Sequence, residues 1–389
     1  MGRNLRKKSG NLFAGSKLNV PGQGIFTVKA FTGYKLQVDE QKNRVPRPSQ
    51  TPSNTPTPTP TITPSVTPTI TPTNTITPTP TITPTNTITP SVTPQTPFIS
   101  IWRTTTPFES ITLPYEISGT YSGTIDWGDS SSSVNSYANR SHSYTTPGDY
   151  TITITGTIQE FSFFTGPSDS AKIIEVTQWG SLKISNGNYQ FYQCSNLVLT
   201  GVTDTLNLVG INSLYGMFYS CTSLTTVNNM NSWNVSSVTD MLGMFNDATS
   251  FNQDISSWNV SSVIYMSNMF QNATSFNQPL NSWNVSNVIY MVGMFQNAAS
   301  FNQPLNSWNV SNVTNMGAMF FNVTSFNQPL NSWNVSNVIN MTYMFQNATS
   351  FNQNLSHWCV TLIPSLPADF DTGATSWALL RPVWGTCPP

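Results

Sequence analysis

The residues that could carry out chemistry are few and far apart in this chain. Histidine occurs only at His142 and His357, so a serine or cysteine nucleophile has no credible partners and zinc has no adequate ligand set. Between Lys183 and Arg381 there is no lysine, arginine or glutamate. The remaining carboxylates of that stretch are Asp204, Asp240, Asp247, Asp254, Asp369 and Asp371. We therefore expect no catalytic residue, no cofactor and no enzymatic activity.

Two groups of aspartates have the oxygen ligands that a cation prefers. Asp126 and Asp129 flank a glycine turn, and Asp240, Asp247 and Asp254 follow one another closely in the chain. Calcium binds such carboxylates, but aspartate more often shapes a turn by accepting a backbone N–H bond. We expect turn-forming carboxylates and no metal site.

The four cysteines fall into two pairs. Cys194 and Cys221 occupy the same register of adjacent repeats, at a spacing that suits either a disulfide or two buried free thiols. Cys359 and Cys387 bracket the C-terminal segment. A disulfide between them would close the end of the fold in an oxidising compartment.

Charge is scarce and unevenly distributed. Charged residues make up 8% of the 389 residues, against roughly 25% in a typical soluble protein. Residues 1–50 contain ten of the fifteen basic residues, but basic side chains at a terminus are solvated anyway, so we expect no nucleic-acid partner. No apolar run is long enough to span a membrane. The first 20 residues lack the apolar core of a secretory signal.

Composition divides the chain into four parts. Residues 1–47 form a small basic head, with a hairpin expected over 25–38 and an anchoring role as a plausible function. Residues 48–97 are rich in threonine and proline. Because proline fixes φ and lacks the amide hydrogen, this part should be an extended stalk, on the order of 150 Å long. Residues 98–170 are expected to form a β-sandwich, and 171–389 a repeat region.

The predicted β-sandwich contains two informative stretches. TIDWGDS (124–130) is a strand that enters a tight glycine turn, and SHSYTTPGDYTITITG (141–156) is a strand, a Pro-Gly turn and an alternating strand. Their order and spacing resemble the PKD (polycystic kidney disease) domain. The resemblance implies an immunoglobulin-like sandwich that serves as a spacer or adhesion module in surface proteins. We expect His142 to be a packed structural residue.

The repeat region is marked by aromatic residues at constant spacing. SFNQPLNSWNVSNV occurs at 275–288, 300–313 and 325–338. The first two units have 27 residues and the later ones 25, which gives eight coils that start near residues 179, 206, 233, 258, 283, 308, 333 and 358. A fixed period of about 20–30 residues is typical of a solenoid. The aromatic residues predicted to form its core ladder are Trp179, Trp233, Trp258, Trp283, Trp308, Trp333, Trp358, Phe245, Phe270, Phe295, Phe320 and Phe345.

Each coil is predicted to be a short strand followed by a short helical turn. Trp283 and Val285 alternate as in a strand, whereas Val288, Met291 and Met294 step by three, as on one face of a turn. No coil can bury its own apolar edge, so stacking builds one continuous core. The asparagines that follow the tryptophans are also expected to form a ladder between coils; they are Asn234, Asn259, Asn284, Asn309 and Asn334.

The repeat units resemble the BspA-like leucine-rich-repeat surface proteins of bacteria, whose repeats have about 25 residues. The stretches that carry the resemblance are MFQNATSFNQPLNSWNVSNVIYM and FYSCTSLTTV, and it extends over residues 171–389. It implies a leucine-rich-repeat-like solenoid used for surface display, adhesion or host interaction, with no catalytic residues.

These features together predict a mainly β, non-enzymatic surface protein. Its solenoid is expected to bind a protein or a carbohydrate on a cell surface. Because no secretion signal is seen, a phage or viral particle is an attractive carrier, with residues 1–47 attached to the virion. The alternatives are a cellular surface adhesin exported by an unrecognised route and a structural spacer without a ligand. The expected location faces the extracellular side in each case.

Overall fold

The computed structural model describes residues 17–20, 24–31, 36–38, 95–164 and 169–388. The chain separates into two units, Met1–Thr85 and Asn86–Pro389. In the first unit, three strands form an antiparallel sheet in the order β1-β2-β3, namely β1 (Lys17–Val20), β2 (Gly24–Phe31) and β3 (Leu36–Val38). The hairpin predicted over 25–38 is present as β2 and β3, and β1 adds a third strand. The predicted stalk lies outside the described residues as far as residue 94.

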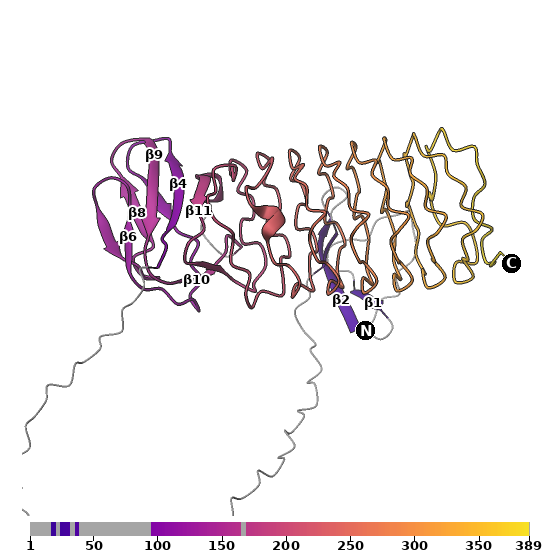
Figure 1. The fold of residues 1–389 in the computed structure, drawn as a ribbon, viewed down its shortest axis with the longest axis horizontal. Helices are drawn as coiled ribbons and strands as arrows, with labels where there is room; N and C mark the ends of the chain where they lie inside the picture. The colour runs from indigo at the N-terminus through magenta and orange to yellow at the C-terminus, as the bar shows by residue number, and fades with distance from the viewer. Residues whose placement is uncertain (1–16, 21–23, 32–35, 39–94, 165–168, 389) are drawn as a thin grey trace, which may run out of the picture. The chain divides into compact units, whose positions relative to one another are not determined.

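The second unit begins with a region of strands (Figure 1). A five-stranded sheet has the order β11-β4-β9-β6-β7, and smaller sheets pair β5 with β8 and β10 with β12. Burial alternates along β4, which places Phe98 and Trp102 in the core. The strands are β4 (Phe98–Thr104), β5 (Glu109–Thr112), β6 (Thr124–Asp126), β7 (Ser132–Val134), β8 (Ser141–Tyr144), β9 (Gly148–Ile154), β10 (Ile158–Phe161), β11 (Ile173–Gln178) and β12 (Leu182–Ile184).

Strand β11 connects this sheet to the repeat region. It pairs antiparallel with β4, with Ile173 opposite Trp102, although it lies beyond the boundary predicted at residue 170. Glu175 of the same strand forms a parallel bridge with Val198 of the first coil. A single cluster of buried hydrophobic side chains includes both regions, from Phe98 to Trp377. The sheet and the coils therefore share one core, and residue 170 marks no break in the packing.

Beyond β12 the chain forms coils that lie side by side (Figure 1). Neighbouring coils are joined by parallel bridges of one residue each, such as Tyr265 to Tyr290 and Tyr290 to Asn315. Helix is almost absent: the described residues contain only two three-residue 3₁₀ segments, η1 (Asp169–Ala171) and η2 (Met230–Ser232). The described structure is therefore mainly β.

The contact between coils is not at the predicted position. From Trp233 to Trp333 a bridge lies seven residues after the tryptophan, at Tyr290 in the coil that starts at Trp283, so the strand predicted at Trp283 and Val285 is wrong. Tight turns explain the difference. The Val288 N–H donates to the Val285 carbonyl at 3.0 Å, and the Met294 N–H donates to the Met291 carbonyl at 3.3 Å. These turns bend the chain before a strand can extend.

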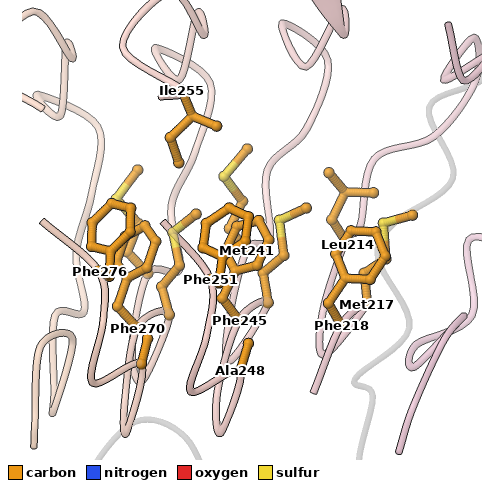
Figure 2. Close-up of a cluster of buried hydrophobic side chains, with 14 of the residues drawn as sticks. Leu214, Met217, Phe218, Met241, Phe245, Ala248, Phe251, Ile255, Phe270 and Phe276 are labelled. Atoms are coloured by element: carbon orange, nitrogen blue, oxygen red, sulfur yellow. The ribbon is translucent and has the colours of Figure 1, made fainter. Parts of the chain in front are cut away.

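The interior of the stack consists of aromatic and methionine side chains in register (Figure 2). The ring centroids of Phe245 and Phe270 are 5.7 Å apart, and their planes differ by 7°. In the five coils that start at Trp233 to Trp333 a second phenylalanine packs against the first, with Phe251 centred 3.9 Å from Phe245. Each such ring removes roughly 150–250 Å² from water. At about 25 cal/mol per Å² its burial therefore stabilises the stack by several kcal/mol.

Candidate functional site

The predicted aromatic ladder lies in the core of the stack. All twelve of its residues are at most 4% exposed. Trp308 and Trp333 have ring centroids 6.4 Å apart and parallel planes. The Trp308 indole N–H donates at 2.8 Å to the carbonyl of Leu280, 28 residues earlier in the chain. Trp258, Trp283, Trp333 and Trp358 make the same kind of bond. These side chains build the stack and are not exposed to a partner.

Trp179 and Trp233 are exceptions. Both indole Nε1 atoms are buried and have no hydrogen-bond partner. Trp179 begins the first coil. Trp233 follows a coil of 27 residues in which Leu206 stands at the tryptophan position.

The asparagines predicted to link the coils do not do so. All five are exposed, and each accepts a bond from the backbone N–H of the serine two residues later, as Asn284 does from Ser286 at 3.2 Å. The predicted ladder at this position is therefore wrong. A short amide side chain satisfies its own turn before it can reach a neighbouring coil.

Two other rows of amides do link the coils. The first row, at positions with left-handed backbone, joins Asn297 to Asn272 at 2.6 Å and Asn322 to Asn297 at 2.8 Å. The second, which we name the paired amide ladder, consists of Asn252, Asn277, Asn302, Asn327 and Asn352 with Gln278, Gln303, Gln328 and Gln353. In each rung the glutamine Nε2 donates to the backbone carbonyl and to Oδ1 of the asparagine in the preceding coil.

The aspartates of the stack accept hydrogen bonds from backbone N–H groups and from an asparagine of the first amide row. Asp240 Oδ1 accepts the Leu242 N–H at 2.9 Å, and Asp254 Oδ1 accepts the Ser256 N–H at 2.9 Å. Asp247 accepts from the amide of Asn272, at the start of the first amide row. Among the described residues, no group of three or more His, Cys, Asp or Glu side chains is arranged to hold a metal ion.

The sheet region brings a histidine, an aspartate and a serine together. The His142 Nε2 lies 2.7 Å from Asp129 Oδ2 and 3.3 Å from Ser131 Oγ. Both partners meet the same ring nitrogen, so the imidazole does not stand between acid and hydroxyl as in a catalytic triad. Burial opposes ionisation of Asp129, but hydrogen bonds from Ser131 and His142 outweigh it and lower the pKa of this carboxyl. The His142 ring stacks on Trp127 at 5.0 Å.

Turn formation accounts for the two aspartates of the WGD stretch. Asp126 Oδ1 accepts the Gly128 N–H, and Asp129 Oδ1 accepts the Ser131 N–H, both at 3.0 Å. This is the turn geometry expected of the two carboxylates.

The two cysteine pairs differ. Cys359 and Cys387 form a disulfide. Cys194 and Cys221 are buried free thiols, and the Cys221 Sγ donates to the Phe191 carbonyl at 3.0 Å. Burial raises the pKa of both thiols, which makes them poor nucleophiles.

A cluster of tyrosines on the first two coils was not expected from the sequence. This tyrosine cluster consists of Tyr189, Tyr192, Tyr215 and Tyr219, all partly exposed. The Tyr189 and Tyr215 rings are 4.8 Å apart, and the Tyr189 hydroxyl donates to the Tyr215 hydroxyl at 2.8 Å. Burial raises the pKa of Tyr189, so its hydroxyl stays protonated. The signal lies in NYQFYQC and LYGMFYSC, where tyrosines surround the core phenylalanine of each coil.

A glycine makes room for this cluster. Gly216 has φ +59°, and a Cβ atom added there would lie 2.3 Å from Cδ1 of Tyr189. Tyrosine at a protein surface combines a large apolar face with a polar tip, which suits contact with a partner. The tyrosine cluster is therefore the candidate binding surface.

The fold and this surface define a mainly β protein built on stacked repeats of about 25 residues. Residues 185–298 and 281–376 match the model of a family described as "Mycoplasma protein of unknown function, DUF285". The match is consistent with a BspA-like surface repeat protein, in a family whose description leaves the function open. No curated protein and no solved structure gave a match. Within the part of the chain that the structure describes, no helix has the length and hydropathy to cross a bilayer.

Proposed function

We propose that this chain is a non-enzymatic surface-display and adhesion protein. In this proposal the coils form a leucine-rich-repeat-like solenoid, supported by a PKD-like sandwich and a threonine-proline stalk. The observation that carries the proposal is the tyrosine cluster. Its four aromatic rings are partly exposed and do not belong to the buried ladders that form the core. The scarcity of charge in the stack favours a partner bound by hydrogen bonds and apolar contact.

The proposed partner is a protein or a carbohydrate on a cell surface. The carrier proposed is a phage or viral particle, with residues 1–47 as the anchor. Mass spectrometry of purified particles should detect the chain. Its presence in a cell envelope without particles would favour the alternative, an exported cellular adhesin.

Cell binding by the fluorescently labelled full chain tests the adhesion proposal. Tyr192→Ser combined with Tyr219→Ser should weaken binding at least tenfold, because removal of interface tyrosines commonly costs about 2 kcal/mol or more. The control is Tyr343→Ser, an exposed tyrosine of a later coil that lies outside the cluster. Unchanged binding by the double variant would assign adhesion to another face. No binding to any cell type would favour a structural spacer.

A further inference from the structure

A polar hollow lies where the 27-residue coils give way to the 25-residue coils. Its volume is about 470 Å³, within the range of about 300–1,000 Å³ that small-ligand sites occupy. The residues that line it are Thr200, Thr226, Val227, Asn228, Asn229, Asn231 and Gln253. The hollow is separate from the tyrosine cluster, with which it shares no residue.

The hollow exists because the paired amide ladder starts at this point. Gln278 donates to the backbone carbonyl and to Oδ1 of Asn252, at 3.1 and 3.0 Å. Gln253 has the same position one coil earlier, but the preceding coil has Thr225 and Thr226 in place of the Asn-Gln pair. Gln253 Nε2 donates instead to the carbonyl of its neighbour Asp254 at 3.1 Å. The shorter threonine side chains leave the space that an amide pair fills in later coils.

The segment of the longer coil that contains its extra residues also lines the hollow. Asn229 precedes η2 with left-handed backbone, at φ 60° and ψ 10°, and its side chain makes no capping hydrogen bond. The Asn228 side chain is held by its Nδ2, which donates to the Val202 carbonyl at 2.7 Å. Its Oδ1 is the atom of that amide with which a ligand donor could bond.

The chemistry of the lining selects for a neutral ligand rich in hydroxyl groups. Two hydroxyls and four carboxamides line the hollow, and no charged side chain does. Carboxamides and hydroxyls both donate and accept, as sugar hydroxyls do. An anion would find no cationic side chain, because none occurs between Lys183 and Arg381.

We propose that this hollow is a binding subsite for a neutral saccharide, in which sugar hydroxyls take the place of the missing amide rung. The inference rests on the proposed adhesive function and names its ligand class. Gln253 and Asn229 are the residues proposed to bind the sugar, and Thr226 also lines the hollow.

The full chain can be tested by saturation-transfer-difference NMR and by titration calorimetry. The probes are glucose, galactose, mannose and N-acetylglucosamine, with glucuronic acid as a charged comparison. We expect at least one neutral sugar to bind with a Kd on the order of 1 mM, typical of a single weak subsite. Thr226→Trp, which fills the hollow, should abolish binding. Thr222→Trp, at an exposed threonine of the same coil that does not line the hollow, should leave Kd within about twofold.

Asn229→Gly separates ligand contact from folding. Glycine adopts the left-handed backbone of this position without strain, so the variant should fold normally and bind the sugar about threefold to tenfold more weakly. Three results would overturn the proposal: no binding by any neutral sugar, equal binding by the Thr226→Trp variant, or preference for glucuronic acid. If sugar binding fails while tyrosine-dependent cell binding persists, the subsite is refuted and the adhesive function stands.

Discussion

The first two coils and the later coils use the same core but differ on their surfaces. From Trp258 to Trp358 each ladder tryptophan N–H donates to a carbonyl, and each glutamine of the paired amide ladder bonds to the preceding coil. Trp179, which begins the first 27-residue coil, and Trp233, which follows the second, each leave a buried N–H without a partner. The tyrosine cluster and most of the polar hollow also belong to these two coils.

The difference shows what exact repetition does in this molecule. The polar groups of a repeated unit form hydrogen bonds with the neighbouring unit, so they are occupied within the stack. Where the repeat length changes, polar and aromatic groups remain that can meet a ligand. This contrast is the reason why the proposed binding surfaces lie on the irregular coils.

The largest effect is expected at the glycines that occupy one register of two coils. Gly216→Ala should destabilise the chain by about 2–4 kcal/mol, because left-handed backbone and contact with the Tyr189 ring both oppose a Cβ atom. Gly243→Ala is the matched control. It has φ +58° but no atom nearer than 3.7 Å, so about 1 kcal/mol is expected. Urea unfolding measures both. Equal losses would mean that the tyrosine cluster does not need this close approach.

The next effect separates the two kinds of asparagine. Asn302 Oδ1 accepts bonds from the Asn327 N–H at 2.9 Å and from Gln328 Nε2 at 3.0 Å. Asn302→Ala should therefore cost about 1–2 kcal/mol. Asn284→Ala removes only a local turn bond at an exposed residue and should cost under about 0.5 kcal/mol. A larger loss for Asn284→Ala in urea unfolding would restore the asparagine ladder that the sequence predicted.

A smaller effect distinguishes satisfied from unsatisfied indoles. Trp308→Phe removes a buried hydrogen bond to the Leu280 carbonyl, which keeps the Trp283 backbone N–H as its other donor, and should cost about 1 kcal/mol more than the loss of ring area alone. Trp233→Phe removes an N–H that has no partner, so this additional cost should be absent. Thermal unfolding of both variants gives the comparison. Equal costs would show that a bound water or a shifted carbonyl serves Trp233.

The smallest effect concerns pH and extends the comparison to the sheet region. The Thr105 N–H bonded to Glu109 outweighs partial burial and, together with Lys172 and the Thr106 N–H, lowers the pKa of Glu109 to about 2. A lowered folded-state pKa stabilises the protein above the unfolded value of about 4.3, and the contribution is lost as pH falls towards 2. Wild type and Glu109→Gln should therefore differ in unfolding midpoint at pH 6 and converge near pH 2. A constant difference would exclude ionisation as the cause.

The sequence predicted the core better than the surface. Trp283 and Met291 repeat at fixed spacing because stacking demands an apolar side chain at each inward position, so periodicity alone reveals burial. Asparagine carries no such signal, because Asn284 and Asn302 have the same side chain and differ only in whether a turn or a neighbouring coil lies within reach. The bridge at Tyr290 could not be found from alternation, since one residue of extended chain has no period. The hollow depends on Thr225 and Thr226, which stand where the later coils have an Asn-Gln pair. This difference is recognised only when the coil is compared with the later ones.

Strand β11 has a mechanical consequence. It is hydrogen-bonded to β4 on one side and bridged to the first coil through Glu175, and the coil begins directly after it at Trp179. The Gln178 amide also donates to the Pro97 carbonyl at 2.9 Å, beside the start of β4. A force applied to the coils would thus be carried by several interstrand hydrogen bonds at once. Such a joint resists tearing far better than a single flexible tether.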